Sequence, residues 1–425
     1  MQTKAVRLYG KEDLRLEEFE LPKIKDNEIL AKVVTDSICM SSYKAAHQAT
    51  DHKRIPDNIA TEPVMIGHEF AGDIVEVGSK WTDKFKPGDK FSIQPALNDE
   101  NGPVGVLSAP GYSYKYIGGD ATYVIIPDEV MENDCLLKYT GEGYYPASLA
   151  EPISCVVGAM HANYHTKPGS YVHEMEIMQG GNMAILAGVG PMGLAAINYA
   201  INREDRQPGL LVVTDIDQTR LDRAASLYTV EQAKKNGIDL RYVNTANMGN
   251  AEKGLRELTN DSRGFDDVFV FAPVPALIEQ ADSILAQDGC LNFFAGPSNP
   301  DFSAKFNFYN VHYQFTHIVG TSGGNNDDMK ESLYYFEKGL DPAGLVTHIG
   351  GLDAVIDTTL NLPNIPGGKK LIYNHISLPL TAISEFEEKG KTDSIFAELD
   401  KICKKNNGLW SVEAENYLLD QLIEN

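Results

Sequence analysis

Apolar and polar residues alternate along the first 130 residues in short runs that predict β-strands. The runs at 4–9, 14–19 and 28–34 each have a period of two, and turns containing Gly, Pro or polar residues separate them. The segments 73–78 and 85–93 continue the pattern. This part of the chain is therefore expected to form a barrel-like or sandwich-like β-rich domain.

From about residue 159 the pattern changes to apolar runs that alternate with helical periods. Buried strands are predicted at 183–187, 210–215, 240–243, 267–271, 289–296 and 316–324, and helices at 194–200, 221–227 and 276–286. Such alternation predicts a parallel doubly wound sheet with a nucleotide at the carboxyl ends of its strands. Residues 166–182 are interpreted as an inserted loop.

The change of pattern divides the chain into two domains of α/β class. We expect a β-rich catalytic domain over residues 1–158, a dinucleotide-binding domain over 159–324, and a return to the first domain over 325–425. The last 35 residues have the amphipathic pattern of helices and form an extension to which the sequence assigns no chemistry.

The strand at 183–187 leads into a glycine-rich turn, Gly188-x-Gly190-x-x-Gly193. Glycines at this spacing permit a tight turn, close approach of the backbone to a pyrophosphate, and close packing of helix on strand. A second strand ends at Asp215, 22 residues beyond Gly193, where the ribose 2′-hydroxyl needs an acceptor. The expected cofactor-binding residues are Gly188, Val189, Gly190, Pro191, Met192, Gly193, Asp215 and Arg220.

Asp215 also predicts the choice of cofactor. Its carboxylate would repel the 2′-phosphate of NADP(H), so NAD(H) is expected as the cofactor and NADP(H) is disfavoured. Arg220, five residues further on, is the residue that could instead bind such a phosphate or lie along the adenosine.

Composition narrows the class of partner. The net charge of −23 argues against nucleic acid and anionic membranes, and means that an anionic substrate needs a local basic cluster. Five scattered cysteines without a CxxC pair indicate a reducing compartment. No apolar run reaches the roughly 18 residues of a membrane span, and no signal peptide is visible, so a cytoplasmic protein is expected.

Several motifs in order resemble the zinc-dependent medium-chain alcohol and polyol dehydrogenases. They include Cys39-x-Ser41, Gly67-His68-Glu69, Lys86-Pro-Gly-Asp-Lys90, Leu149-Ala-Glu151-Pro and the glycine-rich turn, and they cover roughly the first 350 residues. The sequence Glu151-Pro resembles that of the sorbitol and sugar-phosphate branch of this family. The resemblance implies a GroES-like catalytic domain joined to a Rossmann domain, with the active site in the cleft between them.

The resemblance also implies a catalytic zinc ion. Cys39, His68 and a carboxylate from Glu69 or Glu151 would supply the three protein ligands of such an ion, leaving one position open. Zinc would stabilise the alkoxide from which hydride leaves. Ser41 matches the hydroxyl that passes the substrate proton toward solvent in this family. Two carboxylates and a thiolate on a divalent ion would leave a net negative charge, so we expect that Glu69 and Glu151 do not both bind permanently.

One departure from the family is plain. Many relatives carry a four-cysteine lobe for a structural zinc, but residues 94–119 contain no cysteine. We therefore expect one catalytic zinc and no structural zinc. Tyr112, Tyr114 and Tyr116 alternate instead, which predicts one face of a strand, either at the mouth of the cleft, at an oligomer contact, or on an exposed edge.

The expected reaction is NAD-linked interconversion of a secondary alcohol and a ketone on a sugar or polyol phosphate. A basic segment just after Cys39 supports a phosphorylated substrate, because cations there could bind the phosphate. The same composition would also suit a solvated surface helix. The basic residues of this segment are Lys44, His47, His52, Lys53 and Arg54. The alternatives are a dehydrogenase of unphosphorylated polyols, a zinc-free reductase, and a silent nucleotide-binding protein. A homo-oligomer, dimer or tetramer, is expected.

Overall fold

The computed structural model describes residues 1–423 and divides into two compact units. The first unit comprises Met1–Glu151 together with Asp341–Asn425, and the second comprises Pro152–Leu340. Most of α4 (Ala150–Ala162) and all of α11 (Asn326–Glu337) belong to the second unit. The sequence predicted domain boundaries near residues 158 and 324. The first of these positions lies inside α4, and the second lies just before α11.

The first unit is built around an eight-stranded sheet in the order β20-β18-β19-β3-β5-β6-β9, with β8 also paired to β3. Its strands are β3 (Ile29–Ile38), β5 (Phe70–Val77), β6 (Lys90–Ile93), β8 (Tyr123–Ile126), β9 (Leu136–Lys138), β18 (Val346–Gly351), β19 (Lys369–Tyr373) and β20 (Thr381–Ala382). A three-stranded sheet contains β2 (Asp13–Glu20), β1 (Gln2–Gly10) and β4 (Val64–Met65), and β7 (Pro103–Val106) lies outside both sheets. The alternating runs of the sequence thus form strands because each run has one face for the core.

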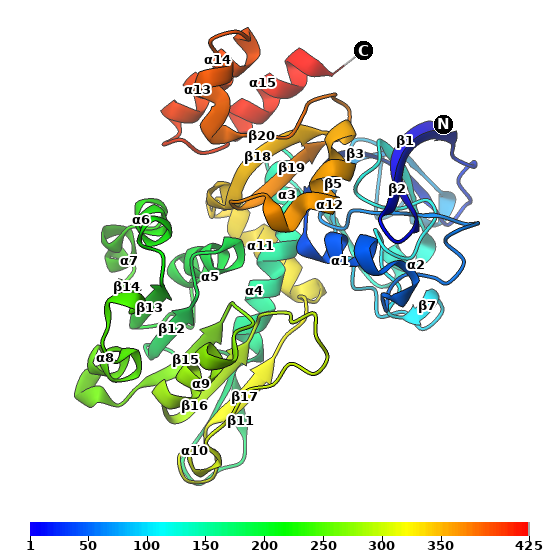
Figure 1. Cartoon of the computed structure of the whole chain (residues 1–425). Coiled ribbons are helices and arrows are strands. Elements are labelled where there is room, and N and C mark those ends of the chain that lie inside the picture. Colours follow the sequence, from blue (N-terminus) through cyan, green and yellow to red (C-terminus); the bar gives the residue numbers. More distant parts are fainter. Residues whose placement is uncertain (424–425) are drawn as a thin grey trace. The chain divides into compact units, whose positions relative to one another are not determined.

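The helices of the first unit lie in the segments that connect or follow these strands. They are α1 (Met40–Gln48), α2 (Asp128–Glu132), α3 (Tyr145–Ser148), α12 (Val355–Asn361), α13 (Phe386–Lys389), α14 (Ser394–Lys405) and α15 (Val412–Leu422). The last two lie in the predicted C-terminal extension and α13 directly precedes it; all three are drawn in orange and red beyond β18, β19 and β20 in Figure 1. Their apolar faces enter a core cluster that includes Tyr145, Leu371, Tyr373 and Trp410.

The second unit is a six-stranded parallel sheet in the order β14-β13-β12-β15-β16-β17. Its strands are β12 (Asn182–Leu186), β13 (Leu210–Asp215), β14 (Asp239–Asn244), β15 (Phe265–Val270), β16 (Leu285–Phe293) and β17 (His317–Gly320). The remaining helices are α5 (Pro191–Asn202), α6 (Gln218–Leu227), α7 (Val230–Lys235), α8 (Ala251–Glu257), α9 (Pro275–Ile284) and α10 (Phe308–Tyr313). The order reverses direction at β12, which is the switch point where a doubly wound sheet binds its ligand.

The segment interpreted as a loop before β12 contains a hairpin, so that interpretation was wrong in part. Strands β10 (Tyr164–Thr166) and β11 (His173–Met175) pair antiparallel. The Tyr164 ring stacks on His173 with 4.2 Å between ring centroids and lies 4.4 Å from the ring of His317. Aromatic stacking of this kind gives a short hairpin a packed face that hydrophobic periodicity alone does not reveal.

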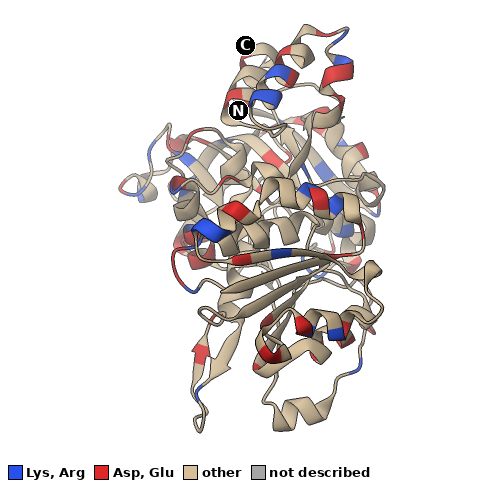
Figure 2. Ribbon diagram, turned by 90° about the vertical axis from the view of Figure 1, so that its left-hand side faces the viewer, with Lys and Arg blue, Asp and Glu red and all other residues tan. Residues whose placement is uncertain are grey.

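Charge is spread over both units. Basic and acidic positions are interspersed along the elements visible in Figure 2. Acidic residues outnumber basic ones by 60 to 37, so a bound anion depends on a local group of cations. None of the helices in residues 1–423 is both long and apolar enough to cross a lipid bilayer.

Candidate active site

Cys39, His68 and Glu69 form a compact group of potential metal ligands in the first unit. One donor atom from each residue lies within 4.8 Å of the other two. Cys39 directly follows β3, and His68 and Glu69 directly precede β5. Because β3 pairs antiparallel with β5 and Asp36 lies opposite Phe70, the end of one strand meets the start of the other. Sheet register thus brings together three residues that the sequence predicted as ligands.

The chemistry of this group fits zinc. Burial lowers the pKa of His68 to about 4, so its imidazole is neutral and can donate a lone pair. Burial, together with the negative charge of Glu69, raises the pKa of Cys39 to about 12 in the absence of a cation. Metal binding would therefore displace the thiol proton. Sulfur, imidazole nitrogen and carboxylate oxygen are the three donor types that zinc takes in proteins.

Lys369 is a component of this group that the sequence did not predict. It is the first residue of β19, is 6% exposed, and its ammonium group donates to both carboxylate oxygens of Glu69. Ser37 donates a further hydrogen bond to Glu69. Burial would lower the pKa of Lys369, but the charge of Glu69 raises it above its usual value, so the ammonium group stays charged.

Lys369 changes the charge balance that the sequence suggested. A thiolate at Cys39 and carboxylates at Glu69 and Glu151 carry three negative charges, which a divalent ion and the Lys369 ammonium group would balance together. The signal in the sequence was a pair of lysines at 369 and 370 directly before the short apolar run Leu371-Ile-Tyr373. Buried lysines in strands are rare unless paired, so this pattern could have indicated a carboxylate partner.

Glu151 lies near the group but outside its tight core. It is in the first turn of α4 and is half-buried. Its negative charge contributes to raising the pKa values of both the Cys39 thiol and the Lys369 ammonium group. The structure thus brings Glu151 into electrostatic range of the ligands while leaving Glu69 as the carboxylate in closest contact with Cys39 and His68.

Tyr112 is a second functional candidate that strand periodicity misplaced. The expected strand of alternating tyrosines was wrong, because residues 107–122 form turns and Tyr112 is buried. Its hydroxyl oxygen lies 3.3 Å from Nε2 of His68, and it also shares a hydrogen bond with Ser41. The Ser41 hydroxyl lies 3.7 Å from the Cys39 sulfur. The hydroxyl groups of Tyr112 and Ser41 therefore border the potential metal ligands His68 and Cys39.

Only part of the basic segment approaches this site. Arg54 lies 5.9 Å from the centre of the Tyr112 ring, and its positive charge contributes to lowering the pKa of His68. Burial and the neighbouring Arg54 charge lower the pKa of His52 to about 4, so His52 carries no charge at neutral pH. His47 instead pairs with Glu12 at the surface, 2.8 Å apart.

The glycine-rich turn in the second unit has the geometry expected of a phosphate loop. A Cβ atom on Gly193 would lie 2.2 Å from the carbonyl oxygen of Gly188, so only glycine permits α5 to approach β12 this closely. Gly190 is the N-cap of α5, and a Cβ there would lie 3.6 Å from the Arg220 guanidinium group. The start of α5 can therefore present free backbone N–H groups beside a cation.

The remaining predicted cofactor residues surround this turn. Val189 is buried, and Pro191 and Met192 form the half-buried first turn of α5. Asp215 ends β13, as predicted, and its Oδ1 atom accepts hydrogen bonds from the backbone N–H groups of Ile216 and Asp217. These bonds fix the orientation of the carboxylate at the carboxyl edge of the sheet.

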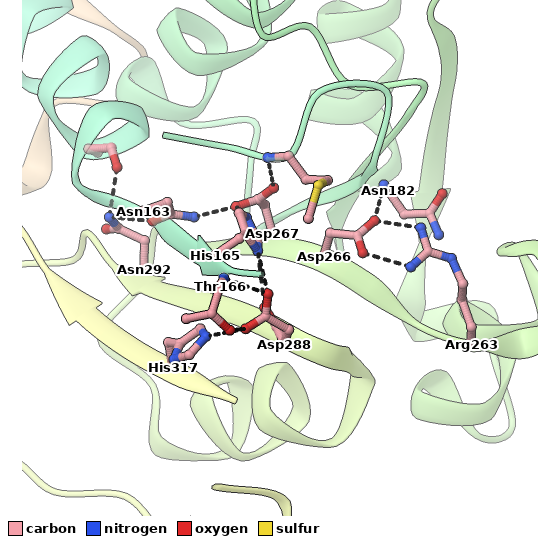
Figure 3. Close-up of polar contacts among 12 residues, drawn as sticks. Asn163, His165, Thr166, Asn182, Arg263, Asp266, Asp267, Asp288, Asn292 and His317 are labelled. Carbon is pink, nitrogen blue, oxygen red and sulfur yellow. Dashed lines mark hydrogen bonds and ion pairs between the residues drawn. The ribbon is translucent and has the colours of Figure 1, made fainter. Parts of the chain in front are cut away.

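A second buried group of histidines and carboxylates lies elsewhere in the second unit (Figure 3). Both ring nitrogens of His165 are hydrogen bonded, Nε2 to Asp267 at 3.1 Å and Nδ1 to the backbone oxygen of Asp288 at 3.0 Å. Asp288 also accepts from Thr166 and His317. Burial would lower the pKa of His165, but the hydrogen bond and charge of Asp267 raise it above its usual value.

The fold, a β-rich unit and a doubly wound parallel sheet, and the group of potential metal ligands are those of a metal-dependent α/β dehydrogenase. The family model described as zinc-binding dehydrogenase matches residues 191–338, and the alcohol dehydrogenase GroES-like domain matches residues 25–134. The chain belongs to the zinc-binding medium-chain alcohol dehydrogenase family and is an oxidoreductase of that family. The predicted family and the predicted pairing of a GroES-like with a Rossmann domain are confirmed.

Full-length relatives lie in the sugar-phosphate branch. The chain is 52% identical to mannitol-1-phosphate 5-dehydrogenase of Aliivibrio fischeri, over 99% of this chain and 98% of the relative. It is 49% identical to L-sorbose 1-phosphate reductase of Klebsiella pneumoniae, over 98% and 97%. The structure of 2R,3R-butanediol dehydrogenase from Bacillus subtilis has the same fold, with a TM-score of 0.68 and 22% identity over 87% of this chain and 99% of that one.

Proposed function

We propose that this chain is a zinc-dependent, NAD(H)-linked dehydrogenase that interconverts a secondary alcohol and a ketone on a sugar or polyol phosphate. The observation that carries the proposal is the group formed by Cys39, His68 and Glu69, whose donor atoms lie within 4.8 Å of one another. The two relatives named for sugar phosphates, each about half identical over almost their whole length, support the substrate class.

Each residue near the ligands has a defined task in this reaction. Cys39, His68 and one carboxylate would hold the metal. When bound, zinc stabilises the alkoxide of the substrate while the nicotinamide accepts its hydride. The Ser41 hydroxyl, hydrogen bonded with Tyr112, would carry the substrate proton away from the site. Lys369 would keep the carboxylate-rich site close to neutral.

Glu69 and Glu151 would not both bind the metal permanently. Hydrogen bonds from Lys369 and Ser37 already engage both oxygens of Glu69, so its direct coordination must compete with a buried ion pair. Glu151 is then the carboxylate that can exchange with Glu69 or act through water. Metal X-ray absorption spectra of the resting enzyme that required two directly bound carboxylates and no water would contradict this assignment.

Arg54 is the cation best placed to favour a phosphorylated substrate. A charge-assisted hydrogen bond to phosphate stabilises a complex by about 1.5–3 kcal/mol, or roughly 10- to 150-fold in affinity. We expect kcat/KM for a keto-sugar 1-phosphate to exceed that for the free keto-sugar by at least about tenfold, and Arg54→Ala to remove most of this ratio. Lys84→Ala, which alters an exposed ion pair with Asp134, is the matched control.

The same comparison tests the substrate class. A ratio near one in the unaltered enzyme would contradict the phosphate and indicate a dehydrogenase of unphosphorylated polyols. A high ratio that survives both Arg54→Ala and Lys44→Ala would show that other residues bind the phosphate.

Asp215 supports NAD(H) as the cofactor. A ribose 2′-hydroxyl can donate to its carboxylate, whereas a 2′-phosphate would meet a like charge. We expect a higher kcat/KM with NAD than with NADP, and Asp215→Ala to narrow that gap by about 1–3 kcal/mol. Equal kcat/KM values for the two cofactors would contradict the assignment and point instead to Arg220, which lies beside Gly190.

The edge of the six-stranded sheet supports a homo-oligomer. Within residues 1–423, β17 pairs with β16 on one side and with no strand on the other. A second copy could pair antiparallel with this edge about a two-fold axis and cover the large apolar side chains exposed around it. These side chains are Phe308, Tyr309, Tyr313, Phe315 and Ile318.

Light scattering after size exclusion tests this interface. Ile318→Lys places a charge on the proposed contact and should lower the mass to that of a smaller assembly. Val230→Lys, at an equally exposed apolar position on α7, should leave the mass unchanged. A monomeric unaltered protein, or an Ile318→Lys variant of unchanged mass, would contradict the interface.

A further inference from the structure

The C-terminal extension contributes a buried carboxylate to the core of the first unit. Glu415 lies on α15, is 0% exposed, and accepts three hydrogen bonds. The backbone N–H of Tyr144 donates to Oε2 at 2.5 Å, and the backbone N–H of Tyr145 donates to Oε1 at 2.9 Å. The Tyr373 hydroxyl also donates to Oε1, at 2.9 Å, and itself accepts from the Trp410 indole N–H at 2.8 Å.

The chain around Tyr144 is shaped to receive this carboxylate. Gly143 has φ of +72°, and a Cβ atom there would lie 2.6 Å from Oε2 of Glu415. Glycine is therefore required both by the backbone conformation and by the close approach of the carboxylate. A carboxylate that accepts from two consecutive backbone N–H groups holds that piece of chain in one orientation.

Both segments that Glu415 holds lead directly to the proposed metal site. Tyr145 begins α3, and the buried residues Leu149 and Ala150 connect that helix to Glu151. Tyr373 ends β19, and the first residue of the same strand is Lys369, the partner of Glu69. One carboxylate thus links the chain segment that carries Glu151 with the strand that carries Lys369, the partner of Glu69.

We propose that Glu415 is a positioning residue. Through Tyr144, Tyr145 and Tyr373 it fixes the two chain segments that carry Glu151 and Lys369. The metal ligands therefore have their correct positions only while the C-terminal helix α15 is packed against the first unit. The proposal rests on the function proposed above. It assigns to the extension a role in the active site without contact with substrate or metal.

The protonation state of Glu415 should matter at neutral pH. Burial raises its pKa to about 7, despite hydrogen bonds from Tyr144 and Tyr373 that favour the charged form. A proton on Oε2 would face the Tyr144 N–H, so protonation should weaken that bond as pH falls through about 7. The titratable or charged groups that face Glu415 or its tyrosine partners are Asp73, Lys90, Tyr139, Tyr144, Tyr145, Asp341 and Tyr373.

Glu415→Gln tests the proposal because its amide group imitates the protonated acid. Glu413→Gln is the matched control, since Glu413 lies on the same helix and makes an exposed ion pair with Lys405. In the zinc-loaded enzyme we expect Glu415→Gln to lower hydrogen-exchange protection at Tyr144 and Tyr145 about tenfold and to speed zinc loss to a chelator about tenfold. We also expect kcat to fall about tenfold with KM for the cofactor unchanged.

The outcomes separate this proposal from the proposed function. If Glu415→Gln shows faster hydrogen exchange and zinc loss, the positioning role is supported even when the unaltered enzyme has no activity on sugar phosphates. That lack of activity would contradict the proposed substrate class. A folded Glu415→Gln variant with unchanged protection and zinc retention would overturn the positioning role. If that variant does not fold, the unaltered enzyme provides the test. Hydrogen-exchange protection at the Tyr144 and Tyr145 amides, corrected for intrinsic exchange, should be lower at pH 6 than at pH 8. Equal protection at the two pH values would overturn the proposal.

Discussion

Two buried groups in this molecule each combine a histidine with a carboxylate, and the pKa values of the two imidazoles shift in opposite directions. The group at Cys39, His68 and Glu69 has a neutral imidazole, with a pKa of about 4 for His68. In the group at His165 and Asp267, the carboxylate raises the pKa of the imidazole above its usual value. The first group offers a neutral imidazole and a thiol to a cation, whereas the second holds its imidazole against a carboxylate.

The difference comes from the partners of each imidazole: the ring nitrogens of His68 lie 3.3 Å from two hydroxyl groups, those of Ser42 and Tyr112, whereas Nε2 of His165 faces the Asp267 carboxylate. Asp267 accepts hydrogen bonds from Asn163, His165 and the backbone N–H of Met178, so both its oxygens are engaged (Figure 3). Such a network binds the hairpin β10–β11 to the sheet and leaves no place for a ligand. A buried histidine beside an acid is therefore suited to a metal where its imidazole stays neutral and a thiol adds a third donor.

Replacing the histidine of each group should separate the two roles most strongly. His68→Asn removes a metal ligand, and because the metal stabilises transition-state charge by several kcal/mol, kcat/KM should fall at least about 10³-fold with loss of bound zinc. His165→Asn should keep zinc and most activity but lower the free energy of unfolding by about 3 kcal/mol. Zinc content, kinetics and urea unfolding of both variants measure this, and zinc loss in His165→Asn would contradict the distinction.

The ion pair between Lys369 and Glu69 should behave unlike an exposed one. Lys369→Met leaves the Glu69 charge buried without its cation, so the metal-free protein should lose about 3–5 kcal/mol of stability. The double variant Lys369→Met with Glu69→Gln should recover most of that loss, because the uncompensated charge is gone. Urea unfolding of the metal-free proteins tests this as a double-mutant cycle, and additive effects would contradict the proposed pairing.

The raised pKa of His165 predicts a smaller, pH-dependent effect. A histidine whose pKa is higher in the folded than in the unfolded protein stabilises the fold when it is protonated. This contribution is fully present below the unfolded pKa of about 6.5 and is lost as the pH rises through the folded pKa. The difference in unfolding free energy between the unaltered protein and His165→Asn should therefore shrink as pH increases from 6 to 9. A difference that grows over this range would contradict the charged imidazole.

Periodicity and motif spacing predicted the local elements of this protein well. The strand at 210–215 has the bounds predicted from the sequence, and the glycine-rich turn lies between β12 and α5. Family motifs also singled out Cys39, His68 and Glu69, whose donor atoms lie within 4.8 Å of one another in the structure. Each of these features depends on residues close together in the sequence.

Partners distant in the sequence were not predicted. Lys369 reaches Glu69 across 300 residues because β19 pairs with β3, and hydrophobic periodicity does not encode which strands become neighbours. Glu415 and Tyr144 are 271 residues apart and meet because α15 packs in the same core cluster as the start of α3. The prediction of a strand around Tyr112 was wrong, because aromatic residues also alternate in irregular segments that pack against a hydrophobic core.

The metal content and coordination of the purified enzyme test the central claim most directly. After loading with zinc and removal of loosely bound ions, elemental analysis should give about one zinc per chain, and X-ray absorption should show one sulfur ligand with the rest nitrogen and oxygen. Cys39→Ser should remove the sulfur ligand and most of the tightly bound zinc. Two zinc ions per chain, or a sulfur ligand that persists in Cys39→Ser, would contradict the assignment of Cys39, His68 and a carboxylate as the single metal site.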